Sequence, residues 1–326
     1  MRVIYAGLDE AGYGPMLGPL CVGLSVFEVE ADEDRAPDLW SRLSEAVCRE
    51  PRDGRRRLPV NDSKARNLSY LGKRLPLTHL VRSLLSCAAR DGGVAHDDAA
   101  LLEALGAVLP SAPWYGGPGV DMPLASTADA IGIDANRVHT AMRTGEVQLL
   151  DLRCRMTDES AFNEIVRASG SKAQATASAF IAGIRRVLEA PEASAATEAG
   201  GFVRIACDRL GGRTRYEAIL ERAGAERVDV VERSERACVY DIEVGGVPAR
   251  VLFQPEADAT HFPVALSSMV AKLVRELMMM RFNRYWSSRA PELKPTAGYT
   301  TDARRWLADA AGVVTEAERT AMVRIA

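Results

Sequence analysis

Histidine is scarce in this sequence of 326 residues, with four occurrences, and the six cysteines show no paired spacing. A zinc site needs clustered cysteine and histidine ligands, and a disulfide framework needs cysteines at regular spacings in a small secreted chain. The sequence therefore predicts neither. We expect the cysteines to be reduced and partly buried.

Long apolar runs are also missing, and the first residues lead directly into a strand-like segment without a basic region followed by an apolar one. Membrane spans and secretion signals need these patterns. We therefore expect a cytoplasmic protein that makes no membrane contact. Since 47% of the residues are hydrophobic and 26% are charged, the chain has enough apolar side chains for a globular core.

A strong positive charge is absent as well, because the formal net charge is −3. A protein that coats nucleic acid through its overall charge is excluded, so any such contact must come from local basic patches. Residues 55–57 are three consecutive arginines, and residues 272–305 are rich in lysine and arginine. A solvated face remains the more common explanation for such runs.

The pattern of apolar residues predicts alternating strands and helices. Runs rich in apolar and β-branched residues predict strands over residues 3–8, 20–29, 147–156, 202–208, 228–232, 238–244 and 247–253. Apolar residues at helical spacing predict helices over residues 76–88, 99–108, 214–223, a helix capped by Ser171 and a long helix that begins at Pro263. Residues 189–200, rich in alanine and glutamate, suggest a linker.

Two adjacent acids, Asp9 and Glu10, follow the first strand and precede a turn that contains Gly12 and Gly14. Neighbouring side chains on a strand point to opposite faces, so these acids can converge on one ion only where the strand ends. Glycine permits the turn and lets a ligand approach the main chain closely. A surface turn with two solvated acids is the alternative reading.

Acids at the ends of other strands extend this group. Asp208 ends the strand 202–208, and Asp258 follows the strand 247–253. Four carboxylates brought together need a compensating cation, because like charges raise each other's pKa. Oxygen ligands favour Mg²⁺ or Mn²⁺, and two such ions can support displacement at phosphorus without a histidine.

Several stretches together resemble the type 2 ribonuclease H family. They follow in the family's order along nearly the whole chain: Asp9-Glu10-Ala11-Gly12-Tyr13-Gly14-Pro15 with Gly18-Pro19, Asp62-Ser63-Lys64, Asp208, Ala257-Asp258 with Pro263 and residues 268–272, and Gly298-Tyr299-Thr300-Thr301-Asp302 ahead of Trp306. The first stretch is the most specific of them, and the others gain weight from their order.

The resemblance implies an α/β fold of the RNase H-like kind, with a mixed β-sheet flanked by helices, a helical insertion and C-terminal helices. Residues 1–326 would form a single domain. Residues 31–59 would be a peripheral insertion and residues 92–146 an insertion subdomain. Trp114 and Tyr115, which lie between glycines and prolines in the second insertion, could stack on a base, although folding back onto the domain is the preferred interpretation.

The resemblance also implies an activity: hydrolysis of the RNA strand in RNA/DNA hybrids, or cleavage at ribonucleotides in duplex DNA. These nucleic acids would be the partners. By this resemblance Asp9, Glu10, Asp208 and Asp258 would be the catalytic residues and the ligands of Mg²⁺ or Mn²⁺. The substrate would be bound by Gly12, Tyr13, Gly14, Ser63, Lys64 and Tyr299. The ribose 2′-hydroxyl distinguishes RNA from DNA and is a natural target for main-chain donors in the glycine turn.

Two positions depart from the family's pattern. Tyr13 stands where the family has arginine, which removes a charge and five donors. Glu256 stands where relatives have lysine, and a solvated strand end is its preferred interpretation. Two alternatives therefore stay open: a non-catalytic or altered-specificity nucleic-acid-binding protein on the same fold, and a nuclease that acts on another substrate.

Overall fold

The computed structural model describes residues 1–31, 36–49, 55–61, 83, 95–122, 124 and 127–325. The helix expected over residues 76–88 lies outside these residues, apart from Ser83. No helix within the described residues is long and apolar enough to cross a membrane. The five cysteines described are free and buried, as expected.

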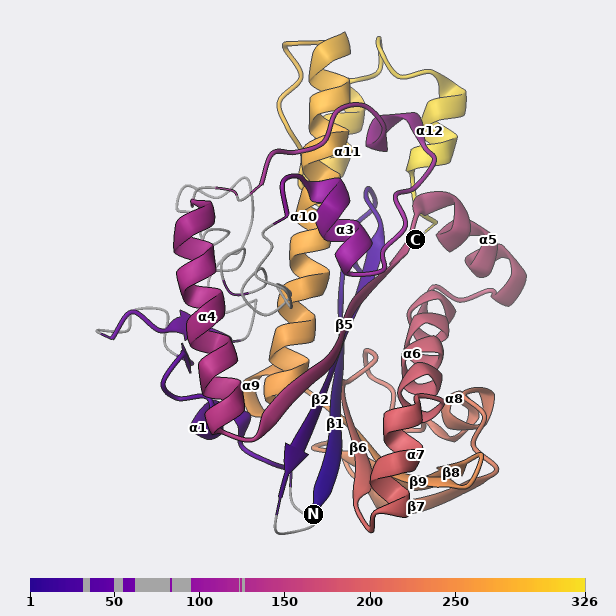
Figure 1. Cartoon of the computed structure of the whole chain (residues 1–326). Helices are drawn as coiled ribbons and strands as arrows, with labels where there is room; N and C mark the ends of the chain where they lie inside the picture. The colour runs from indigo at the N-terminus through magenta and orange to yellow at the C-terminus, as the bar shows by residue number, and fades with distance from the viewer. Residues whose placement is uncertain are drawn as a thin grey trace.

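A mixed sheet of seven strands forms the centre of the molecule, in the order β5-β2-β1-β6-β9-β8-β7 (Figure 1). The strands are β1 (Arg2–Ala11), β2 (Leu20–Glu30), β5 (Val147–Thr157), β6 (Phe202–Asp208), β7 (Arg227–Arg233), β8 (Cys238–Val244) and β9 (Val247–Gln254). Strands β1, β6 and β9 run parallel, and the remaining pairs are antiparallel. A further pair, β3 (Val47–Cys48) and β4 (Leu58–Pro59), lies outside this sheet.

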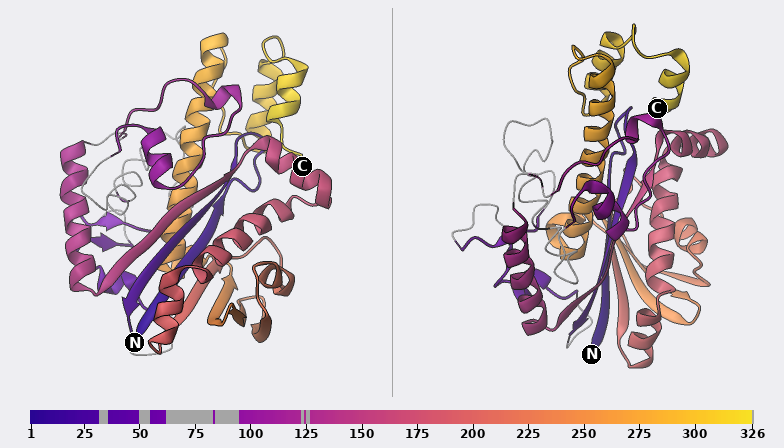
Figure 2. Two further views of the ribbon diagram at one scale, coloured as in Figure 1. Left: turned by 45° about the vertical axis from the view of Figure 1, so that its right-hand side comes forward. Right: turned by 45° about the horizontal axis from the view of Figure 1, so that its top comes forward.

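Helices cover both faces of the sheet (Figure 2). One face carries α6 (Ala173–Leu188), α7 (Pro191–Glu198) and α8 (Glu217–Arg222), and the other carries α10 (Phe262–Arg289). The remaining helical segments are α1 (Leu39–Arg42), α3 (Asp98–Ala104), the 3-10 helix η1 (Pro113–Tyr115), α4 (Ala128–Thr144), α5 (Glu159–Ser169), α9 (Ala257–Thr260), α11 (Thr300–Asp309) and α12 (Glu316–Met322). The expected fold class, a mixed sheet flanked by helices, is confirmed.

Two details of the secondary structure around α6 and α7 differ from expectation. The segment expected as a linker contains α7, because Pro191 occupies a first-turn position and Ala193 and Ala196 bury their side chains under the sheet. The expected cap at Ser171 is wrong. Lys172 is the N-cap of α6 and makes no side-chain capping hydrogen bond.

Both segments expected to be insertions contribute to the core on the α10 side of the sheet. The indole of Trp40 packs edge-on against Phe262 at 5.3 Å between ring centroids and donates to the carbonyl oxygen of Val60 at 2.8 Å. Trp114 and Tyr115 are buried in the same core. Their burial agrees with the preferred interpretation that this loop folds back onto the domain.

Helix α10 packs directly on the main chain of β1 and β2, the two strands that flank the glycine motif. A Cβ atom at Gly7 would stand 2.2 Å from the carbonyl carbon of Pro263, and one at Gly23 would stand 2.0 Å from the carbonyl oxygen of Ser267. Hydroxyl groups reinforce this contact, because Ser267 Oγ donates to the Gly7 carbonyl oxygen at 2.8 Å. Ser25 Oγ likewise donates to the Pro263 carbonyl oxygen at 2.8 Å.

We predict that Gly23→Ala destabilises the protein by about 3 kcal/mol, because the added methyl group meets helix backbone that cannot rotate away. Urea unfolding would measure this as a lower midpoint with an unchanged slope. Gly212→Ala is the matched control, since a Cβ there has no heavy atom within 4 Å. The control should change stability by less than about 0.5 kcal/mol. Equal midpoints for the two variants would contradict the close packing.

Candidate metal centre

Three of the expected carboxylates come together at the carboxyl ends of β1 and β6. Asp9, Glu10 and Asp208 each offer a carboxylate oxygen, and these atoms lie within 4.8 Å of one another. Strand β6 pairs with β1 up to Leu8 and Cys207, so Asp208 follows directly where this pairing ends. Parallel strands with acids at the same end therefore bring the group together.

The expectation that β1 ends at these acids is wrong. The strand continues to Ala11, where Asp9, Glu10 and Ala11 still pair with β2. Only the edge of β1 that faces β6 is unpaired beyond Leu8. We infer that the loss of pairing with β6, while pairing with β2 continues, leaves room for both acids to turn toward Asp208.

Asp258 lies beside this group but outside it. Its side chain is 1% exposed and its charge acts on Asp9, yet it is not among the residues whose ligand atoms lie within 4.8 Å. It belongs to the short helix α9, whose first amide, that of Ala257, donates to Asp208 Oδ1 at 3.1 Å. The preceding Glu256 is exposed, which agrees with the solvated interpretation.

The electrostatics of the site are unfavourable for several negative charges. Burial raises the pKa of Asp9 well above its ordinary value, and the charges of Glu10 and Asp208 raise it further. A hydrogen bond from the Ser268 side chain on α10 acts in the opposite direction and favours the charged form. Because carboxylate oxygens are the donors that Mg²⁺ and Mn²⁺ prefer, this donor set is suited to a divalent cation.

The glycine turn, residues 12–18, follows β1 and is held by buried charged side chains. Arg275 donates to the carbonyl oxygens of Pro19 at 2.9 Å and Leu17 at 3.1 Å. Glu159 Oε1 accepts from the Gly18 amide at 3.1 Å. These contacts give Arg275 a structural role. The sequence pattern gave no indication of Glu159.

The predicted substrate-binding residues fall in two groups. Tyr13 is half-buried and Gly14 is exposed in the glycine turn. Tyr299, 46% exposed, stands next to this turn, since the Gly298 carbonyl oxygen accepts from the Met16 amide at 2.8 Å. Ser63 and Lys64 lie outside the described residues, so their assignment remains a prediction.

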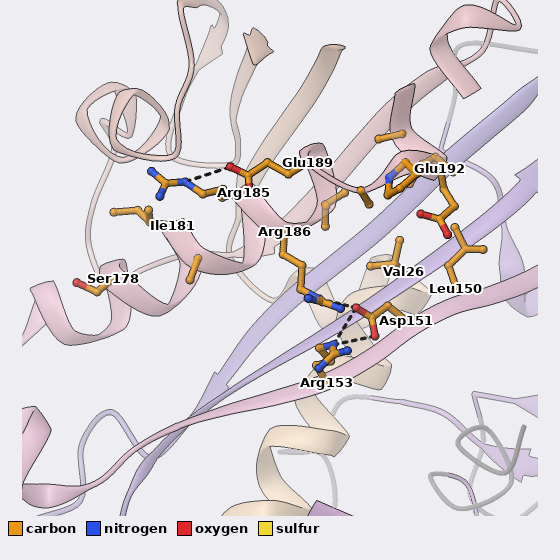
Figure 3. Close-up of a pocket in the computed structure, with 16 residues that line it drawn as sticks. Val26, Leu150, Asp151, Arg153, Ser178, Ile181, Arg185, Arg186, Glu189 and Glu192 are labelled. Atoms are coloured by element: carbon orange, nitrogen blue, oxygen red, sulfur yellow. Dashed lines mark hydrogen bonds and ion pairs between the residues drawn. The ribbon is translucent and has the colours of Figure 1, made fainter. Parts of the chain in front are cut away.

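A separate pocket lies on the opposite face of the sheet from α10, between β5 and α6 (Figure 3). None of the candidate carboxylates lines it. Asp151 in this pocket accepts from two of its arginines, Arg186 at 2.7 Å and Arg153 at 3.1 Å. We therefore do not include this pocket in the candidate centre.

Solved structures of ribonucleases H are similar to this chain. The ribonuclease H2 of Pyrococcus horikoshii is 17% identical, with a TM-score of 0.45 over 99% of this chain and 97% of that chain. RNase HII, solved in complex with PCNA from Archaeoglobus fulgidus, is 15% identical, with a TM-score of 0.45 over 99% and 94%. Bst-RNase HIII, solved in complex with Mn²⁺, is 13% identical, with a TM-score of 0.39 over 99% and 66%.

The motifs of the sequence resemble the family of these solved structures. No protein-family model matches the sequence, and no curated protein sequence matches it.

We predict that Asp9→Asn makes the protein more stable in a chelator at neutral pH, by about 0.5–2 kcal/mol, the range common for stabilising substitutions. The folded state raises the pKa of Asp9, so the folded protein binds more protons than the unfolded one and loses stability as pH rises through that pKa. Removing the charge removes this loss. Thermal unfolding in a chelator would measure the gain.

The same measurement with Mg²⁺ or Mn²⁺ tests the metal. A cation that binds only the folded state stabilises it, by about 2.7 kcal/mol at a concentration 100 times the dissociation constant. Wild type should gain stability, whereas Asp9→Asn should gain much less. Asp129→Asn, at an exposed position in α4, is the control and should behave like wild type. A metal effect of equal size in Asp9→Asn would exclude this centre.

Proposed function

We propose that this chain is a metal-dependent endoribonuclease that hydrolyses the RNA strand of RNA/DNA hybrids or cuts at ribonucleotides in duplex DNA. The observation that carries the proposal is the convergence of Asp9, Glu10 and Asp208 at adjacent strand ends. Such a group is unfavourable without a cation and suits a divalent ion that also contacts substrate phosphate. The resemblance of the sequence motifs to the type 2 ribonucleases H supplies the substrate class.

Asp9, Glu10 and Asp208 would hold Mg²⁺ or Mn²⁺, with Asp258 close enough to contribute its charge. Two such ions, when bound, stabilise the attacking and leaving oxygens of an in-line displacement at phosphorus. Within the chain, the hydrogen bond from Ser268 favours the charged form of Asp9 against the effect of burial, and the Ala257 amide donates to Asp208. The expected products carry 3′-hydroxyl and 5′-phosphate ends.

Recognition of the ribonucleotide would come from the glycine turn and from Tyr299, which stands beside it. The ring of Tyr299 is available to stack on a sugar because it is 46% exposed. Lys172 Nζ lies 5.3 Å from the centroid of the Tyr13 ring. A positive charge therefore accompanies the turn even though Tyr13 replaces the family's arginine, and we assign Lys172 to contact with a substrate phosphate.

We predict that the purified protein cuts an RNA/DNA hybrid or a duplex with one ribonucleotide when Mg²⁺ or Mn²⁺ is present. Asp208→Asn should reduce the rate by more than about 100-fold, since residues that merely support metal ligands already cost about 10- to 100-fold when changed. Denaturing gels of end-labelled substrates would measure the cleavage. Asp129→Asn again serves as the control. Cutting that survives Asp208→Asn would exclude the proposed centre.

Tyr13 favours a second candidate, a nucleic-acid-binding protein that has kept the fold without the activity. The side chain of tyrosine cannot supply the charge and the paired donors of arginine. This candidate predicts binding of the same duplexes with no cleavage in either metal and no stabilisation of wild type by metal. Gel-shift and thermal unfolding measurements on wild type therefore separate the two candidates.

A further inference from the structure

Arg324, which follows α12, donates to two consecutive carbonyl oxygens of the glycine turn. Its Nη1 atom donates to the carbonyl oxygen of Gly12 at 2.5 Å, and its Nη2 atom donates to that of Tyr13 at 3.0 Å. Its own amide donates to the Met16 carbonyl oxygen at 2.9 Å. Its Nη1 atom also donates to the Gly18 carbonyl oxygen at 3.4 Å, so one residue, more than 300 positions away in the sequence, fixes the main chain of the turn at four points.

Because peptide groups are planar, the direction of these two carbonyl groups also fixes the direction of the N–H groups that follow them. In a trans peptide the carbonyl oxygen and the following N–H point in opposite directions. Because the carbonyls of Gly12 and Tyr13 both face Arg324, the N–H groups of Tyr13 and Gly14 both face away from it. Gly12, with a left-handed φ of 94°, turns the chain immediately before these two peptide planes.

These two N–H groups form a small concave pair of donors. Successive N–H groups on one side of the chain bind anionic or oxygen acceptors. Neither group donates to a partner within the part of the chain that the structure describes. Gly14 is exposed, and a Cβ there would have no heavy atom within 4 Å, so the space beside Gly14 is open.

Arg324 is itself fixed from the other side. Asn163 on α5 donates from Nδ2 to the Val323 carbonyl oxygen at 2.9 Å and accepts the Ile325 amide on Oδ1 at 2.8 Å. The guanidinium lies over the Phe162 ring, 3.9 Å from its centroid. The arginine therefore has a defined position and cannot follow movements of the turn freely.

A contribution to stability alone does not explain why an arginine occupies this buried position. Its side chain is 3% exposed, and its Nε atom has no hydrogen-bond partner among the described residues. Burial, with the nearby charge of Arg275, lowers its pKa to about 10. A buried charge with an unsatisfied donor is expensive, and well-packed apolar residues commonly replace buried charges without loss of stability.

We propose that Arg324 is the positioning residue of the ribonucleotide-recognising turn: by holding the carbonyls of Gly12 and Tyr13, it directs the N–H groups of Tyr13 and Gly14 toward the ribose 2′-hydroxyl. This inference rests on the proposed function for its substrate. It assigns recognition to the main chain, which the replacement of arginine by Tyr13 leaves unchanged.

Binding measurements test the proposal. Fluorescence anisotropy would give dissociation constants for an all-DNA duplex and for the same duplex with one ribonucleotide, with Ca²⁺ in place of Mg²⁺ or Mn²⁺ and gels to confirm intact substrate. Wild type should prefer the ribonucleotide duplex. In Arg324→Met the ratio of the dissociation constants for the all-DNA and ribonucleotide duplexes should fall by about tenfold, which is the effect of losing about one hydrogen bond. Affinity for the all-DNA duplex should change little beyond the effect of one charge.

Arg319→Met is the matched control, because Arg319 is an exposed arginine on α12 and the substitution removes the same charge. It should keep the wild-type preference. Arg324→Lys keeps a charge and donors but lacks the paired geometry of the guanidinium, so its preference should be intermediate. If thermal unfolding shows that Arg324→Met is not folded, the binding measurement is made with Arg324→Lys instead.

The outcomes separate this proposal from the proposed function. A preference that is unchanged in both Arg324 variants, or a loss of affinity equal for the two duplexes, overturns the role of Arg324. A wild type with no preference also overturns it, whether or not the protein cuts. A wild type that prefers the ribonucleotide duplex in an Arg324-dependent way but never cuts would overturn the endoribonuclease and leave the positioning role supported.

Discussion

The contact between α10 and the glycines of β1 and β2 is the constraint on which the rest of the structure depends. Gly7 and Gly23 let the helix lie on the strand backbone itself, so no side chain separates the two elements. Residues of α10 then reach groups on the strands at fixed distances. Ser268 contacts Asp9, and Arg275, about 10 Å further along the helix axis, holds the glycine turn. One packing interface therefore places both the acids and the turn.

The sequence predicted those parts of the site that follow from local pattern. Asp208 could be assigned because it ends an apolar strand, and Asp9 because it precedes a glycine turn. The parallel pairing of β1 with β6 then brings these acids together, because the carboxyl ends of the two strands lie at the same edge of the sheet. The succession of strands along the chain and the long helix that begins near Pro263 also followed from apolar patterns.

The contributions of Arg324 and Glu159 could not be predicted, because they come from contacts between distant segments. Both are single charged residues in helical or post-helical sequence, and their local pattern is that of solvated side chains. The glycine turn lies far from them in the chain, and only the tertiary fold brings its carbonyls and amides to them. The helix α7 was missed for a related reason: its short alanine-rich stripe is buried only because the sheet lies beneath it.

Burial has opposite consequences for the two kinds of charge in this region. The acids are held close together by the sheet, where a divalent cation, which the chain does not itself provide, would relieve their repulsion. The arginines are held by main-chain carbonyls, which the chain does provide, so their positions are fixed before any ligand arrives. The turn is thus preorganised, whereas the proposed metal would be needed to stabilise the charged form of the carboxylates.

This division explains how Tyr13 can replace an arginine within the motif. If the side chain at this position supplied the main contact with the ribonucleotide, its replacement would remove recognition altogether. The buried guanidinium of Arg324 binds the carbonyl groups on either side of the Tyr13 α-carbon, and these groups are the same for every amino acid. If the proposed recognition by the main chain holds, it would depend on the fold around the turn, and the side chain at position 13 would adjust contacts with phosphate and solvent.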